Sequence, residues 1–115
     1  MNSQELGCHA ETLAAEFFVA RGCTVLARNL ILPGGEIDLL MLDGDDVAVV
    51  EVKALSDDRF YDPLDKIDPA KLRKLRRMLS IVAARYPERN VRLDVATVRY
   101  RGGEPVLEHL PDVLS

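Results

Sequence analysis

Residues 35–53 read GEIDLLMLDGDDVAVVEVK, and this stretch decides the fold. It contains two runs rich in aliphatic residues, 36–42 and 46–54, which is the composition of β-strands. Between them, residues 43–46 read DGDD, a segment of turn-forming residues. Two strand-like runs joined by so short a turn predict a β-hairpin.

The turn also predicts how the two strands pair. A two-residue type II′ loop at Gly44-Asp45 fixes the register, because each facing pair is then set by its distance from the loop. This register places apolar residues opposite apolar residues along the hairpin. It also predicts that Asp38 lies opposite Glu51 and that Glu36 lies opposite Lys53.

These charged residues need a physical explanation, because ionised groups within apolar strands are costly unless they are paired, hydrogen-bonded or bound to a metal. Side chains alternate along a strand, so Glu51 and Lys53 share one face. Two facing carboxylates, Asp38 and Glu51, repel each other unless a cation lies between them. Oxygen ligands of this kind suit Mg²⁺ or Mn²⁺. The alternative is a buried ion pair in which Lys53 neutralises Glu51 or Glu36 and no metal is bound.

The rest of the chain predicts two helices and three further strands. Helical spacing of apolar residues predicts helices over about 3–21 and 68–86, the second with Asp68 as its N-cap. The apolar stripe of the first helix consists of Leu6, Ala10, Leu13, Phe17 and Ala20. Strand-like runs cover 23–29, 91–100 and 106–110, and residues 55–67 are expected to form a loop. The order α-β-β-β-α-β-β predicts an α/β fold with a mixed sheet flanked by helices.

Composition indicates one globular domain spanning residues 1–115. The chain is 48% hydrophobic and 30% charged, and its length suffices for a core without disulfides or zinc. Cys8 and Cys23 are expected to be small buried hydrophobes, and with His9 and His109 they lack the spacing of a zinc site. No apolar run approaches the ~20 residues that span a bilayer. The first residues lack the pattern of a secretory signal, so we expect a cytoplasmic protein with no membrane partner.

The charge distribution is uneven. The formal net charge is −4, yet residues 71–92 contain eight basic residues against the single acid Glu88. A basic segment in an otherwise acidic chain is typical of a site that handles a polyanion. The candidates for contacting a DNA backbone are Lys71, Arg73, Lys74, Arg76 and Arg77. The alternative is a solvated helix face.

Five motifs, taken together, resemble a known family. They are Gly7-x-x-x-Glu11-x-x-Ala14, Arg28-Asn29, Gly35-Glu36-Ile37-Asp38-Leu39, Val50-Glu51-Val52-Lys53 and Arg92-Leu93-Asp94-Val95. The chain resembles the YraN-type family of small bacterial proteins, which belongs to the PD-(D/E)XK endonuclease-like superfamily. The resemblance covers nearly the whole chain. It implies a restriction-endonuclease-like core, similar to that of archaeal Holliday-junction resolvases.

The resemblance also implies roles for individual residues. The acids that match Asp38 and Glu51 bind the metal ion in that superfamily, and the lysine that matches Lys53 assists the attacking water. A glutamate of the first helix, matching Glu11, often completes the metal site. Three positions depart from the family pattern: Leu55 stands where arginine is common, Tyr61 where glycine is usual and Leu93 where phenylalanine is common. The loss of a basic residue at Leu55 weakens the expectation of a phosphate contact there.

Two main hypotheses follow. The first is a Mg²⁺- or Mn²⁺-dependent endonuclease that hydrolyses phosphodiester bonds in DNA, with branched or structured DNA among its candidate substrates. The second is a non-catalytic nucleic-acid-binding or assembly module that retains the nuclease fold. A phosphodiesterase acting on RNA or a small molecule would share the same site. A homodimer is a natural expectation if the substrate is a symmetric junction.

Overall fold

The hairpin builds the middle of a five-stranded sheet. Strand β2 (Gly35–Asp43) pairs antiparallel with β3 (Asp46–Leu55), from Asp43 opposite Asp46 to Leu39 opposite Val50. Gly44 has a φ of 59°, and the next residue does not share this left-handed backbone, as a type II′ turn requires. The predicted register is therefore confirmed over these residues.

The ladder stops before the predicted pairing of Glu36 with Lys53. In the described part of the chain, the pairing of β2 with β3 ends at Leu39 and Val50. Glu36 pairs instead with Ile31 of the neighbouring strand β1 (Thr24–Leu32). The expected 36–53 pair was wrong because β2 continues along β1 after it has separated from β3.

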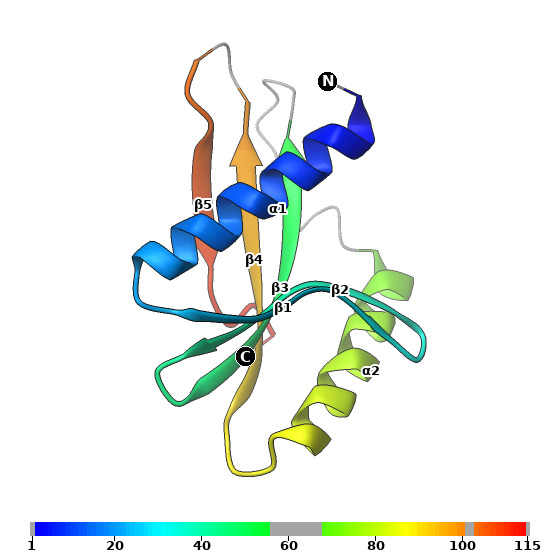
Figure 1. Cartoon of the computed structure of the whole chain (residues 1–115). Coiled ribbons are helices and arrows are strands. Elements are labelled where there is room, and N and C mark those ends of the chain that lie inside the picture. Colours follow the sequence, from blue (N-terminus) through cyan, green and yellow to red (C-terminus); the bar gives the residue numbers. More distant parts are fainter. Residues whose placement is uncertain (1, 56–67, 101–102, 115) are drawn as a thin grey trace.

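The computed structural model describes residues 2–55, 68–100 and 103–114. Helix α1 (Ser3–Ala20) precedes β1 (Thr24–Leu32), and helix α2 (Pro69–Arg85) lies between β3 and β4 (Val91–Arg99), which β5 (Val106–Leu110) follows. The sheet order is β1-β2-β3-β4-β5, with β3 and β4 parallel and the other neighbours antiparallel (Figure 1). The predicted order and the mixed α/β fold are confirmed.

Strand β1 is longer than the sequence predicted. It was expected over residues 23–29, but it continues to Leu32, which pairs with Gly35. A register shift between Val25 and Ala27 and a φ of 50° at Asn29 interrupt its regularity. The prediction ended too early because pairing with β2, not local propensity, carries this strand past its polar residues.

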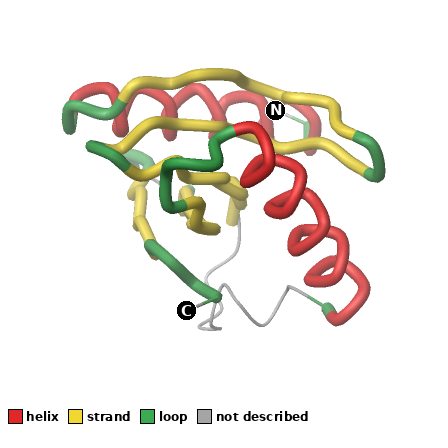
Figure 2. The backbone as a smooth tube through the Cα atoms, turned by 90° about the horizontal axis from the view of Figure 1, so that it is seen from below, coloured by secondary structure: helices red, strands yellow, loops and turns green. Residues whose placement is uncertain are grey.

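The two helices pack on different core clusters. Phe18 of α1 packs in one cluster with Met41 and Val50, while Met78 of α2 packs in the other with Val49. Helix α1 crosses the strands in Figure 1, whereas α2 lies beside the tip of the β1–β2 hairpin, as Figure 2 also shows. Alternate residues of the central strand β3 therefore contact different helices.

Helix α1 buries a different face from the predicted stripe. Its buried residues are Ala10, Ala14 and Phe18. Of the predicted stripe, Ala10 is buried, whereas Leu6, Leu13 and Phe17 are only half-buried and Ala20 is exposed, so the stripe was correct only at Ala10. The pattern of large apolar residues did not identify this face, because two of its three buried residues are alanines, which allow a helix to lie close to a sheet. As a result Glu11 lies next to the buried face and is itself half-buried.

Several other expectations can be compared with the structure. Asp68 caps α2 as predicted, since its Oδ1 accepts a hydrogen bond of 2.8 Å from Lys71 N. Cys8 is exposed and Cys23 is half-buried, so the expectation that both are buried was wrong. Leu55 is the last residue of β3, and the remainder of the expected loop, with Tyr61, lies outside the described residues. No helix in the described ranges is long and apolar enough to cross a membrane.

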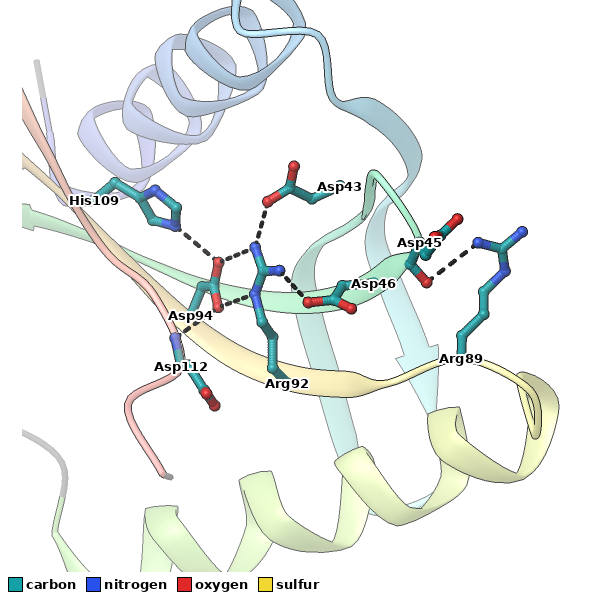
Figure 3. A network of polar contacts seen from close by, with 8 residues as sticks. All are labelled: Asp43, Asp45, Asp46, Arg89, Arg92, Asp94, His109 and Asp112. Atoms are coloured by element: carbon teal, nitrogen blue, oxygen red, sulfur yellow. Dashed lines mark hydrogen bonds and ion pairs between the residues drawn. The ribbon is translucent and has the colours of Figure 1, made fainter.

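A network of charged residues joins the C-terminal segment to the sheet (Figure 3). The Asp94 side chain is fully buried and accepts hydrogen bonds from Arg92, His109 and the backbone N–H of Asp112. Arg92 also forms ion pairs with Asp43 and Asp46, at 2.7 and 2.8 Å. Asp94 is buried but fully partnered, as a buried carboxylate must be.

Candidate active site

Asp38 and Glu51 lie side by side where β2 and β3 separate. The Asp38 Oδ2 atom accepts a hydrogen bond of 2.8 Å from the backbone N–H of Val52, one residue after Glu51. Burial, together with the neighbouring Glu51 charge, raises the pKa of Asp38 to about 7, against the lowering effect of the Val52 N–H. The structure thus brings the two predicted carboxylates together on the α2 side of the sheet.

Two lysines neutralise Glu51. Lys71 Nζ, from the first turn of α2, lies 2.7 Å from Glu51 Oε1, and Lys53 Nζ lies 3.9 Å from the same oxygen. The Glu51 side chain is only 12% exposed. Burial, together with the adjacent Lys71 ammonium, lowers the pKa of Lys53 to about 8. Burial acts to lower the pKa of Lys71, but its hydrogen bond with Glu51 leaves that pKa above its usual value.

Asn29 connects two further carboxylates, Glu11 and Glu36, near Asp38 and Glu51. With its amide oriented to satisfy both partners, Asn29 donates hydrogen bonds to Glu36 Oε1 at 2.9 Å and to Glu11 Oε1 at 3.0 Å. Burial raises the pKa of Glu11, while the Asn29 hydrogen bond opposes the increase. The charges of Glu36 and Glu51 also raise that pKa, so Glu11 lies within electrostatic range of the central site.

These carboxylates border an open cleft of about 740 Å³ between the sheet and α2. Glu36, Asp38 and Glu51 line the sheet side. The side formed by α2 carries the basic residues Lys71, Arg73, Lys74 and Arg77. Four of the five predicted DNA-contacting residues therefore line the cleft, and Arg76 is exposed on α2 but is not among its lining residues.

One end of the cleft depends on a close approach between α2 and the β1–β2 turn. Gly34 has a φ of 92°, which a residue with a side chain adopts only with strain. At Gly35, a Cβ atom would lie 3.1 Å from Met78 Sδ and 3.3 Å from Lys74 Cε. The glycine pair therefore lets the hairpin tip pack tightly against the basic helix.

The donor chemistry of this site fits a divalent cation. Asp38 and Glu51 supply hard oxygen atoms, and Mg²⁺ commonly binds through one or two carboxylates while water and substrate phosphate complete its shell. Among residues 2–55, 68–100 and 103–114, no group of three or more Asp, Glu, His or Cys side chains is arranged to hold a metal. The fit is therefore to a two-carboxylate site, with Glu11 held nearby by Asn29.

The sequence did not predict that Asn29 and Lys71 contact the carboxylates of the site. Asn29 has a positive φ, and asparagine is among the residues that tolerate this conformation, but nothing local indicates two carboxylate partners. Lys71 had a clearer signal. It is a cation in the first turn of a helix that has no acid there, although the positive end of a helix dipole disfavours cations.

A protein-family model identifies the relatives of this chain. The model of the uncharacterised protein family UPF0102 matches residues 10–98, which include all of the charged cleft residues described above. The chain belongs to the UPF0102 family. The YraN-type resemblance is thereby confirmed.

Other UPF0102 proteins align with this chain along nearly its whole length. A UPF0102 protein of Renibacterium salmoninarum is 42% identical over 110 residues, which are 92% of each chain. UPF0102 proteins of Nocardioides sp. and Mycolicibacterium vanbaalenii are 39% and 38% identical, and the alignments cover 93% and 95% of this chain and 89% and 93% of theirs. The UPF0102 relationship therefore extends over about nine-tenths of the chain.

Proposed function

We propose that this UPF0102 protein is a metal-dependent phosphodiesterase that hydrolyses DNA. The observation that carries the proposal is the cleft, in which Asp38 and Glu51 on the sheet face the basic residues of α2. A phosphodiester needs cationic groups to hold its charge and a polarising centre beside the reacting phosphorus. In this cleft, lysine and arginine side chains would hold the phosphate charge, and the carboxylates would bind the metal ion that polarises the phosphate.

The site residues have distinct roles in this proposal. Asp38 and Glu51 would hold Mg²⁺ or Mn²⁺, with Glu11 as a further candidate ligand. The ion would supply Lewis-acid polarisation of a phosphate oxygen and a more acidic bound water. Lys53, whose pKa is near 8, would orient the attacking water and exchange a proton with it at Nζ. The Val52 N–H holds Asp38 in its orientation.

The basic side chains of α2 would hold the DNA backbone. Arg73, Lys74 and Arg77 are exposed and line the cleft, so they can contact phosphates without reading bases. Such contacts release counterions, so the affinity for DNA should fall steeply as salt rises, with a log–log slope of about −0.9 per phosphate contact. An affinity that is equal at 50 and 200 mM salt would contradict this role.

One observation favours the non-catalytic alternative. Glu51 is already neutralised by Lys71 and Lys53, so the charges of the site are balanced without a metal. A module that only binds nucleic acid would retain the basic face of α2 and use the carboxylates as a structural charge network. The two functions differ in whether a bond is broken, and one assay separates them.

The assay mixes the purified protein with branched, single-stranded and duplex DNA in Mg²⁺ or Mn²⁺. Asp38→Asn and Lys53→Ala should each reduce cleavage by at least about 100-fold, the usual scale for removing a group that acts in the transition state. Asp45→Asn is the matched control, because Asp45 is exposed in the hairpin turn and is absent from the cleft lining. Binding without cleavage of any substrate would support the alternative, and cleavage retained by both site variants would indicate a contaminant.

A homodimer belongs to the same proposal, because a symmetric junction presents two strands to be cut. Val106 of β5 is 61% exposed, whereas Leu107, Val113 and Leu114 are partly buried against the core clusters. Sedimentation equilibrium of the free protein and of its complex with branched DNA tests this expectation. A monomer in both samples would contradict it.

A further inference from the structure

Lys71 occupies an unfavourable position in its helix. Asp68 is the N-cap of α2, which places Lys71 at the third helical position, where glutamate is the preferred residue. The unpaired backbone N–H groups of a helix N-terminus carry partial positive charge, and an ammonium group nearby is disfavoured. The Asp68 carboxylate caps this helix end, but no acid within the first turn adds to it. A partner outside the helix therefore also stabilises Lys71.

That partner is Glu51, and the contact is close. Lys71 Nζ lies 2.7 Å from Glu51 Oε1, and the Lys71 side chain remains 34% exposed toward the cleft. Lys53 approaches the same oxygen at 3.9 Å, so two ammonium groups share one carboxylate. The two ammonium groups therefore lie close to each other, which is unfavourable. Of the two lysines, Lys71 is the one on helix α2, which lines the cleft.

The Lys71 ammonium lies on a carboxylate oxygen that a divalent cation would need as a ligand. A cation bound between Asp38 and Glu51 would bring two positive charges beside Lys71 and would compete for Glu51 Oε1. On the basis of the proposed function, we propose that Lys71 is a displaceable counter-ion of the site. It neutralises Glu51 in the metal-free protein, and metal binding releases it to contact a phosphate of the substrate.

The release has a direct consequence for binding order. Lys71 lines the same cleft as Lys74 and Arg77, so an ammonium freed from Glu51 joins an existing row of phosphate-binding cations. Metal and nucleic acid should then each raise the affinity for the other, because coupling between two ligands is reciprocal. Lys71 is a positioning residue in this scheme, since it acts on the site through Glu51.

The test compares Lys71→Met with Lys74→Met. Both variants remove one positive charge from the same helix and the same cleft, but of these two lysines only Lys71 forms an ion pair with Glu51 in the described residues. Isothermal titration calorimetry with Mn²⁺ alone measures metal affinity without any substrate. Lys71→Met should bind Mn²⁺ about tenfold more tightly than Lys74→Met, within the usual range of coupling between adjacent sites. Circular dichroism confirms that both variants fold.

The outcomes separate this inference from the proposed function. If Mn²⁺ binds to the wild type and Glu51→Gln abolishes binding, but the two lysine variants have equal affinities, the counter-ion role is overturned and the metal site stands. If no variant binds Mn²⁺, both proposals fail.

A second measurement uses the unmodified protein. An amine-reactive ester should label Lys71 several-fold faster after Mg²⁺ is added, while the labelling of Lys74 should stay constant. Equal labelling of Lys71 with and without Mg²⁺, in protein that binds the ion, would also overturn the counter-ion role.

Discussion

The carboxylate of Asp38 accepts a hydrogen bond from the backbone N–H of Val52, at 2.8 Å. This hydrogen bond lies just beyond Leu39 and Val50, the last paired residues of the β2–β3 ladder. A side-chain acceptor therefore satisfies a backbone donor at the point where the two strands separate, as buried N–H groups require. The same hydrogen bond fixes one of the two central carboxylates of the cleft.

The burial of Asp38 predicts a pH-dependent stability. Its pKa is about 7 in the folded protein and 3.8 in an unperturbed chain. Below pH 4 the carboxyl is protonated in both states and costs nothing. Between about pH 4 and pH 7 the unfolded chain is ionised while the folded state still holds the proton, so stability falls over this window and levels off once the folded carboxyl ionises above pH 7.

Asp38→Asn should therefore stabilise the metal-free protein at pH 8.5 and have a much smaller effect at pH 4.5, where the window has only begun. We expect a gain on the order of 1 kcal/mol at the higher pH, or several degrees in Tm. Thermal unfolding followed by circular dichroism at both pH values measures it. A variant that is destabilised at pH 8.5 would show that Asp38 is stabilised as an anion in the free protein.

Asn29 should control the ionisation of Glu11. Asn29→Gly retains a residue that tolerates the φ of 50° but removes the amide that donates to Glu11 and Glu36. We expect the pKa of Glu11 to rise further, because a hydrogen bond to the ionised form is lost. Carboxyl ¹³C NMR titration measures the change. A Glu11 titration that is identical in the variant and the wild type would contradict the bridge.

Arg92 should contribute strongly to stability. Arg92→Met leaves the fully buried Asp94 without its main partner, and breaking a buried ion pair from one side costs about 3 kcal/mol. Arg89→Met is the control, because the exposed Arg89 side chain donates, among the described residues, to the backbone carbonyl of Asp45, and its loss should cost less than about 0.5 kcal/mol. Urea unfolding measures both. Equal losses would mean that Arg92 acts only as a surface charge.

Two glycine-to-alanine substitutions should change the stability of the protein in opposite directions. Gly34→Ala places a side chain at a φ of 92° and should cost about 1 kcal/mol or more. Gly7→Ala lies within α1, where a Cβ meets nothing within 4 Å, and should stabilise the protein by up to about 1 kcal/mol. Both free energies of unfolding are measured in urea. A neutral Gly34→Ala would remove the argument that the turn requires glycine.

Local sequence features predicted most of the fold. The Gly44-Asp45 turn determined the register of β2 and β3, since a two-residue loop leaves one way to pair the strands that follow it. Asp68 and Pro69 set the start of α2. The same features predicted that Asp38 and Glu51 would meet, because both lie on the hairpin whose register the turn decides.

Only the tertiary structure decided what surrounds these two carboxylates. Lys71 reaches Glu51 because α2 packs on the sheet against β2 and β4, which flank β3, and Asn29 reaches Glu11 because α1 packs close to the sheet through small residues. Such contacts depend on how helices cross the strands, and that packing involves residues far apart in the chain. Turn geometry and periodicity act over a few residues, so the sequence alone determined the hairpin and its acids, while long-range packing chose their partners.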